Sequence, residues 1–323
     1  MPAKFLTIIV LLLGISSAGA TSRPPGIRNG ERDHFTLHAE SDRYLNLIDS
    51  VITSTRRKLI GMLGDSLSYK PDIYLVDNVT LFDRLAGGKF PEWGAAVAVP
   101  HRRLIAIKSP NAFNLNRSLP ELLAHEYAHL VVAQKTGFHE APRWFDEGLA
   151  MFVSMEWSWS DNLAMSKAAV FGQFIDLGEI EMVNRFSAGK AHVAYAQSYL
   201  MVEYLFDNYG PEPMRRFLEG IAAGMSHDQA LELATGSNLA EFESDIKIYL
   251  HNHFNVLTLF MDTIYFWLAL AVIVIIAGIS RIRKRRRYYE KWDQEEKFHS
   301  TDFDYGDPDN PEKIDDEDEP WRS

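Results

Sequence analysis

The chain of 323 residues contains no cysteine. Without thiols it cannot form disulfides, thiolate zinc sites, iron–sulfur clusters or a cysteine nucleophile, so any metal must bind to His, Asp or Glu side chains. Proline and glycine, at 14 and 20 residues, are too few for a collagenous or low-complexity chain. With 46% hydrophobic residues, the composition instead predicts one or two domains with a substantial core.

An excess of positive charge is also absent, since the formal net charge is −11. Residues 290–323 hold 14 acidic and four basic residues, whereas residues 281–287 alone carry a charge of +6. The rest of the chain is mildly acidic, and nothing in its charge favours nucleic acid as a partner. The acidic segment is poor in aliphatic side chains, so we expect a disordered tail that either has no partner or binds one in the cytoplasm.

The first 20 residues have the features of a secretory signal peptide. Lys4 precedes an apolar run, Phe5–Ile15, that is too short to span a bilayer, which needs about 20 residues. The small residues Ala18–Ala20 follow, so we expect cleavage after Ala20, with a short uncleaved anchor as the alternative. Residues 21–32 contain two prolines and two glycines and predict a flexible leader.

A second apolar run, Thr263–Ile279, lies near the C-terminus. As a helix these residues extend roughly 26 Å, and Leu257–Met261 can lengthen the run, so we expect one transmembrane helix over residues 257–280. The basic run 281–287 follows at once, and the positive-inside rule places residues 281–323 in the cytoplasm. The body of the protein is then expected outside the cytoplasm.

Residues 33–255 predict one α+β domain in which a small sheet with helices precedes a helical half. We expect strands where apolar and polar residues alternate, and helices where apolar residues recur at helical spacing. The expected order is a strand at 34–39, a helix at 44–63, a strand at 71–76, a short helix at 81–85, a hairpin of strands 94–99 and 104–108, and helices from 118 to 252.

The most informative segment reads SLPELLAHEYAH and begins at Ser118. Ser118 and Glu121 form an S-x-x-E capping box, which predicts a helix N-terminus. Within that helix His125 and His129 are four residues apart on one face, where both imidazoles can bind one metal ion. Glu126 lies beside them and can reach a metal-bound water. This HExxH pattern predicts a hydrolytic metal centre, although the same residues can form a hydrogen-bonded core cluster.

A hydrolytic zinc site needs a third protein ligand. The metzincin arrangement is excluded, because Lys135 and Val132 stand where it requires a histidine and a glycine. Glu147, His139 and Asp146 remain as candidates.

Glu147 belongs to the segment PRWFDEGLA, which begins at Pro142. Proline favours the first turn of a helix, so we expect a second helix here with Glu147 projecting from its first turns. Gly148 would let this helix approach the HExxH helix closely.

HEYAH followed by PRWFDEGLA resembles the gluzincin zinc metallopeptidases, in particular the bacterial peptidase MA-like domain family with its HExxH and WxxEGxA motifs. The similarity extends to the order of strands and helices before the motif and to AYAQSY at residues 194–199, and covers roughly residues 33–250. The resemblance implies a zincin-like, thermolysin-type α+β catalytic domain with a small mixed sheet. It also implies one Zn²⁺ per chain, held by His125, His129 and Glu147.

The same resemblance implies roles for other residues. Glu126 would be the general base that takes a proton from the zinc-bound water. A tyrosine hydroxyl from a later helix assists the oxyanion in related gluzincins, and Tyr195 is our choice over Tyr199 and Tyr204. His192 is close in sequence and could also reach the site.

Substrate binding is expected at the sheet. In such folds the edge strand pairs with an extended peptide, and residues 94–99 fit this role because their alanines allow close approach of a backbone. The carboxylate that steadies a zinc-bound histidine in some relatives falls here at Met151, so the groups supporting the ligands stay unassigned.

The favoured function is a membrane-anchored zinc metallopeptidase that cleaves a peptide or protein substrate on the periplasmic side of a bacterial inner membrane. The alternative is a catalytically inactive zincin-fold binding or scaffolding module at the cell envelope, although an intact Glu126 argues against it. An intramembrane protease is excluded, because charged Glu121 and Lys135 flank the HExxH motif and no apolar run of spanning length surrounds it.

Overall fold

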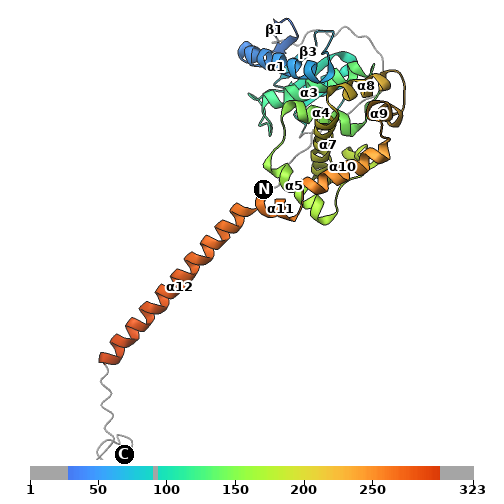
Figure 1. Cartoon of the computed structure of the whole chain (residues 1–323). Helices are drawn as coiled ribbons and strands as arrows, with labels where there is room; N and C mark the ends of the chain where they lie inside the picture. Colours follow the sequence, from blue (N-terminus) through green and yellow to red (C-terminus); the bar gives the residue numbers. More distant parts are fainter. Residues whose placement is uncertain (1–27, 90–93, 299–323) are drawn as a thin grey trace, which may run out of the picture. The chain divides into compact units, whose positions relative to one another are not determined.

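The computed structural model describes residues 28–89 and 94–298 and divides into two compact units between Asp262 and Thr263 (Figure 1). The expected signal peptide over residues 1–20, most of the leader and the acidic tail beyond residue 298 lie outside the described residues.

The first unit is α+β and mainly helical, as expected. Its described residues form one mixed five-stranded sheet, with the order β1 (Arg28–Glu31), β2 (Thr36–Ala39), β3 (Asp72–Val76), β5 (Leu104–Lys108) and β4 (Ala96–Val99). The three central strands run parallel, and β1 and β4 are antiparallel to their neighbours. The sheet therefore has antiparallel strands at both edges of its described part.

Strand β1 corrects the expectation of a flexible leader over residues 21–32 for its last part, Arg28–Glu31, whereas residues 21–27 lie outside the described residues. Arg28–Glu31 pairs in register with β2, and the turn between them is closed by a bond from Arg32 N to Phe35 O of 3.0 Å. The segment RNGE has no apolar alternation, so its strand depends on backbone pairing rather than on side-chain pattern. The sequence of residues 28–31 alone therefore does not predict this pairing.

The two faces of the sheet pack against different helices. On β5, Ile105 and Ile107 belong to the main core, whereas Leu104 and Ala106 belong to a smaller cluster with Phe82. This division follows from the strand period of two. The main core includes α1 (Leu45–Leu63) and the smaller cluster includes α2 (Val79–Ala86).

The helical half contains the HExxH segment. Its helices are α3 (Leu119–Lys135), α4 (Arg143–Ser154), α5 (Trp159–Phe171), α6 (Leu177–Ile180), α7 (Ala188–Tyr209), α8 (Pro211–Ala222), α9 (His227–Thr235), α10 (Leu239–His253) and α11 (Val256–Asp262). Helix α3 contacts β4, β5 and α1, and α4 packs between α3 and α7. Eleven of the 12 residues of α4 are buried, so its polar side chains must find partners inside the protein.

Gly148 allows close packing with a different helix from the one we expected. A Cβ atom at this position would lie 2.2 Å from the backbone oxygen of Ser198 on α7. The glycine therefore permits close contact between α4 and α7, not between α4 and the HExxH helix.

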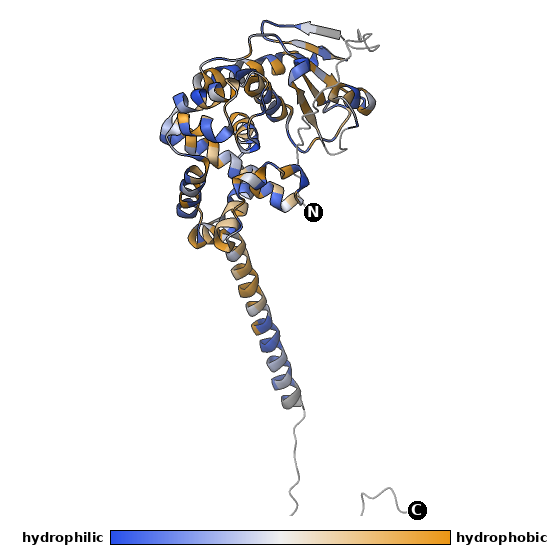
Figure 2. Ribbon diagram, turned by 90° about the vertical axis from the view of Figure 1, so that its right-hand side faces the viewer, coloured by the Kyte–Doolittle hydropathy of each residue, from blue (hydrophilic) through white to orange (hydrophobic). Residues whose placement is uncertain are grey.

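The second unit contains α12 (Ile264–Phe298). Among the described residues, one stretch of helix, Phe266–Gln294, is long and apolar enough to cross a membrane. Figure 2 shows an apolar first part of α12 followed by the hydrophilic basic run. Residues 257–262, which we expected within the span, form the separate helix α11 instead.

Candidate metal centre

Helix α3 begins with the expected capping box. Ser118 N donates to Glu121 Oε2 at 2.9 Å, and Glu121 N donates to Ser118 Oγ at 3.4 Å. The helix runs without interruption past His125 and His129, whose side chains are buried. The two imidazoles therefore project from one face of a helix that is fixed at its N-terminus.

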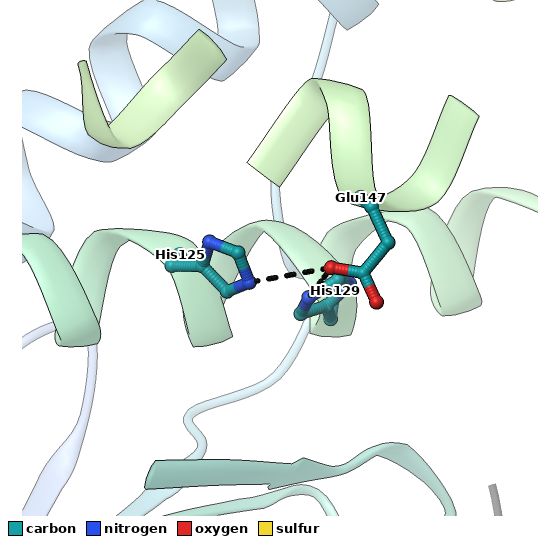
Figure 3. Close-up of side chains that lie close together, drawn as sticks. All are labelled: His125, His129 and Glu147. Atoms are coloured by element: carbon teal, nitrogen blue, oxygen red, sulfur yellow. Dashed lines mark ion pairs between the residues drawn. The ribbon is translucent and has the colours of Figure 1, made fainter. Parts of the chain in front are cut away.

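Glu147 reaches the two histidines from α4, as Figure 3 shows. Its Oε2 atom lies 3.6 Å from His125 Nε2 and 4.0 Å from His129 Nε2. One ligand atom from each residue lies within 4.8 Å of the other two, and all three side chains are buried. The two segments that the sequence analysis linked thus meet in the interior.

These three residues fit a metal ion. The Nε2 atoms of both histidines and Oε2 of Glu147 are buried and have no hydrogen-bond partner among the described residues. Leaving such a group unsatisfied costs about 1–3 kcal/mol. Two imidazole nitrogens and a carboxylate oxygen are a usual ligand set for catalytic zinc, whose bonds of about 2.0–2.1 Å place neighbouring ligand atoms about 3.4 Å apart. The observed spacing is slightly wider than that value.

Each histidine contacts a carboxylate through Nδ1, the ring nitrogen on the side away from the proposed metal. Glu156 Oε1 lies 2.8 Å from His125 Nδ1, and Asp146 Oδ1 lies 2.8 Å from His129 Nδ1. When Nδ1–H donates to a carboxylate, the lone pair of Nε2 is left for a metal. Asp146, a rival third ligand in the sequence analysis, therefore contacts the far side of His129 instead.

His139, the other rival ligand, is exposed and lies outside the cluster. It lines a neighbouring cavity of about 70 Å³ together with His129 and Asp146. Small side chains such as Ala98 and Ala133 form other parts of the wall.

Glu156 was missed in the sequence analysis because a backbone reversal brings it to the site. Met155 caps the C-terminus of α4 with a left-handed φ of 61°, which turns the chain back toward α3. Glu156 there contacts His125, Arg117 and Ser154. A left-handed methionine has no signal in the sequence, since glycine is the usual residue in this conformation.

Arg143 was also missed, although its spacing offers a signal. It lies one turn before Glu147 on α4, and its guanidinium contacts Glu147 Oε1 at 3.1 Å. This contact holds one carboxylate oxygen and leaves Oε2 directed at the histidines. An Arg and a Glu four residues apart are neighbours on a helix face, so the pair could have been predicted.

The charges of the cluster follow from burial and from these contacts. Burial lowers the pKa of His125 to about 3, despite the opposing contact with Glu147. Burial also favours neutral His129, but the Asp146 carboxylate outweighs it and raises the pKa of His129 to about 9. Burial disfavours ionised Glu147, but the Arg143 guanidinium and the histidines outweigh it and lower the pKa of Glu147 to about 2.

Glu126 lies on α3 and faces the edge strand β4. Burial raises the pKa of this carboxyl to about 7, with the charge of His129 and the backbone amide of Ala98 opposing the shift. Both carboxylate oxygens are buried, and neither makes a hydrogen bond of ordinary geometry within residues 28–89 and 94–298. A buried carboxylate beside the three ligand candidates is placed to exchange a proton with a molecule bound there.

The three tyrosines of α7 have different surroundings. Burial and the negative charge of Glu147 raise the pKa of Tyr195, so its hydroxyl is within electrostatic range of the cluster. Tyr199 packs against Trp157 with ring centroids 4.8 Å apart, and Tyr204 packs against Tyr249 at 5.0 Å. The structure thus brings Tyr195, and neither of the other two, near Glu147.

His192, also on α7, faces another group. Its Nε2 atom lies 2.8 Å from Asp161 Oδ1 on α5. The pair links α5 to α7, so the expectation that His192 could reach the site is not supported.

Among the described residues no further strand pairs with the outer edge of β4, and this edge lies beside Glu126. Lys108 N donates to Ala95 O, and the hydrogen-bonded pairs of an antiparallel ladder alternate along the strand. The amide and carbonyl of Val97 therefore face β5, whereas those of Ala96 and Ala98 face away from it. The outward groups of Ala96 and the outward carbonyl of Ala98 are available to an extended chain, whereas the amide of Ala98 faces Glu126.

Comparison with known proteins places most of the first unit in one family. The model of the peptidase MA superfamily matches residues 57–252, which include the three ligand candidates, Glu126 and Tyr195. The chain is also similar to the uncharacterized protein YhcO of Bacillus subtilis (strain 168). The two are 23% identical over 282 residues, covering 76% of this chain and 84% of YhcO.

Proposed function

Because the chain belongs to the peptidase MA superfamily, we propose that it is a membrane-anchored, zinc-dependent metallopeptidase with a zincin-type catalytic domain over residues 33–255. One observation carries the proposal. Two histidine nitrogens and a glutamate oxygen converge in the interior without hydrogen-bond partners among the described residues, on the two motifs of this family.

His125, His129 and Glu147 would hold one zinc ion. When bound, zinc lowers the pKa of a coordinated water and polarises a carbonyl group. The carboxylates of Glu156 and Asp146 keep both imidazoles in the tautomer that presents Nε2. Arg143 holds the opposite oxygen of Glu147 and fixes its orientation.

Glu126 is the proposed general base. Its carboxylate would accept a proton from the attacking water and donate it to the leaving amine, as its position next to His125 and its unsatisfied oxygens allow. The Tyr195 hydroxyl is the proposed donor to the oxyanion, because it lies near Glu147 and can donate a hydrogen bond to negative charge that develops there.

The substrate is proposed to be a peptide or protein in extended conformation. The outward amide and carbonyl groups of Ala96 and the outward carbonyl of Ala98 can pair with its backbone, and the small side chains leave room for that approach. The neighbouring cavity of about 70 Å³ is lined by small apolar side chains and by polar ones such as His101 and His139, and it would suit a small side chain of the substrate.

The proposed location follows from α12 and the basic run after it. With residues 257–280 at the membrane and six cations in residues 281–287 on the cytoplasmic side, the peptidase domain would lie on the periplasmic side of a bacterial inner membrane. The N-terminal signal peptide predicted from the sequence agrees with this topology.

The test compares the wild type with Glu126→Gln, both as full-length protein in detergent micelles loaded with zinc. We expect both to bind one zinc ion, and the wild type alone to cleave a library of quenched peptides. Asp161→Asn is the matched control, since it removes a buried carboxylate whose partner is His192 and which lies outside the cluster, and it should leave cleavage unchanged. Zinc binding without cleavage by the wild type would favour the inactive binding or scaffolding module.

A further inference from the structure

Helices α5 and α11 expose large apolar side chains. Trp159 and Phe171 on α5, and Val256, Leu257, Phe260 and Met261 on α11, are each between 49% and 69% exposed. The two helices pack against each other, as Figure 1 shows, and we call these exposed residues together the α5–α11 patch. Soluble proteins seldom expose so many large apolar side chains together.

The orientation of α11 is the reverse of that of a helix on a soluble protein. Thr258 is half-buried and contacts Ser166 of α5 at 3.3 Å between the two hydroxyl oxygens. The four exposed apolar residues of α11 lie at positions 256, 257, 260 and 261, which share one helix face. The helix thus turns Thr258 and Leu259 toward the domain and its four exposed apolar side chains outward.

The start of α11 is fixed by its own cap. Asn255 Oδ1 accepts hydrogen bonds from Leu257 N at 2.9 Å and Thr258 N at 3.2 Å. The apolar face is therefore held in position by a capped helix rather than by a loose linker.

The position of the patch in the chain indicates what covers it. Helix α11 ends at Asp262 and the apolar helix α12 begins at Ile264, so a single residue joins them. Met261 is the last residue of the patch and precedes Ile264 by three residue steps, which span at most about 11 Å, so the end of the patch lies within that distance of the start of α12. If α12 crosses a membrane, the end of the patch lies at the surface of the same bilayer.

The composition of the patch also suits a bilayer interface. Tryptophan is enriched at the level of the lipid head groups. Lys167 lies on the exposed side of α5 between Trp159 and Phe171, at intervals of eight and four residues, and its long side chain can reach the head groups while its stem covers apolar surface.

We propose that the α5–α11 patch is a lipid-binding surface, which embeds in the outer leaflet of the membrane that α12 spans. This inference rests on the proposed membrane anchor and adds a second contact with the bilayer. Helix α5 packs on α7, which carries Tyr195, so the patch holds the proposed catalytic centre close to the membrane. Substrates that lie near the membrane surface are then favoured.

The absence of cysteine permits a direct test on the full chain. Single cysteines are introduced at Phe171, Leu257 or Phe260, labelled with an environment-sensitive fluorophore, and measured in nanodiscs that hold one chain each. Leu233 on α9, which is 54% exposed, is the matched control outside the patch, and Val274 in α12 is the control for insertion.

We expect lipids with a nitroxide on the acyl chain to quench the probes at the three patch positions at least twofold more than the probe at position 233. Equal quenching at the patch and at position 233, with strong quenching at position 274, would overturn the lipid-binding surface and leave the anchor intact. Protection from aqueous iodide without quenching by lipid would also overturn it, in favour of a protein partner. Absence of quenching at position 274 would overturn the anchor and the inference together.

Discussion

The two histidines of the metal centre depend on carboxylates from different parts of the chain. Asp146 precedes Glu147 directly on α4, whereas Glu156 follows the end of that helix. Each accepts from Nδ1 at the same distance of 2.8 Å. The ligands and the groups that orient them therefore come from α3 and from one short stretch of chain around α4.

Replacing Asp146 with Asn should weaken zinc binding by about 10–100-fold, because the amide no longer fixes the His129 tautomer or favours charge transfer to the metal. Competition with a fluorescent chelator measures the affinity. Asp161→Asn is the matched control, since Asp161 makes an equivalent 2.8 Å contact with His192 outside the cluster. Equal losses in the two variants would show that the effect of Asp146 is one of general stability.

Tyr195→Phe should lower kcat by about 10²-fold and change KM little, because the lost hydroxyl would act in the transition state. Steady-state kinetics on a peptide identified from the library gives both constants. Tyr199→Phe removes a hydroxyl one turn later, where the ring packs on Trp157, and should retain nearly full kcat. The reverse ranking would transfer the proposed role to Tyr199.

At the scale of elements, α4 is held between the HExxH helix and α7. Gly148 permits the contact with α7, since a Cβ there would lie 2.2 Å from Ser198 O and 2.9 Å from a methyl group of Val202. The backbone oxygen cannot move aside without displacing its helix. Glu147 is the preceding residue, so the packing of α4 on α7 also determines where the carboxylate lies.

Gly148→Ala should lower the free energy of unfolding by about 1–3 kcal/mol or more, because the added methyl group overpacks the interface. Urea denaturation measures the change. Gly61→Ala in α1 meets no atom within 4 Å and should instead raise stability by about 0.5–1 kcal/mol, as alanine is favoured over glycine inside a helix. A neutral effect at Gly148 would contradict the close contact.

The edge strand β4 gives a separate prediction. Ala96→Pro removes an amide that faces away from β5, so it should raise KM for peptides while the zinc content stays at one per chain. Val97→Pro removes an amide that faces β5 and should instead lower the thermal unfolding temperature. Unchanged kinetics in folded Ala96→Pro would exclude pairing of the substrate backbone at this position.

Most elements could be predicted because their signals are local. The capping box at Ser118, the period of two in β2 and the 3.6-residue period of α1 each act within a few residues. Strand β1 could not be predicted, because its residues are polar and its contacts, the pairing with β2 and the ion pair of Glu31 with Lys70, are made with other segments of the chain. The same reason applies to the contact of Gly148 with α7, which joins segments 50 residues apart in sequence.

The three candidate metal ligands could be predicted from the sequence, whereas the carboxylates that contact the two histidines could not. The spacing in HExxH brings His125 and His129 together, and the family motif adds Glu147. The position of Glu156 depends on a left-handed turn at Met155. Whether Asp146 binds the metal or contacts His129 Nδ1 depends on the direction of its side chain. Both are decided by the packing of α4 rather than by local sequence.

At the scale of the whole molecule, the chain combines a family domain with an apolar C-terminal helix. The family match covers residues 57–252, and the helix begins at Ile264. Helix α11 occupies most of the interval between them and exposes an apolar face. The arrangement supports a peptidase that works at a membrane surface rather than in free solution.

The zinc content of the purified full-length protein tests the central claim most directly. After loading with zinc and dialysis, elemental mass spectrometry should find one ion per chain in the wild type and in His139→Gln, which removes the rival ligand outside the cluster. Glu147→Gln should lose most of the zinc while remaining folded by circular dichroism. Full retention of zinc by Glu147→Gln, or its absence from the wild type, would contradict the assignment of the site.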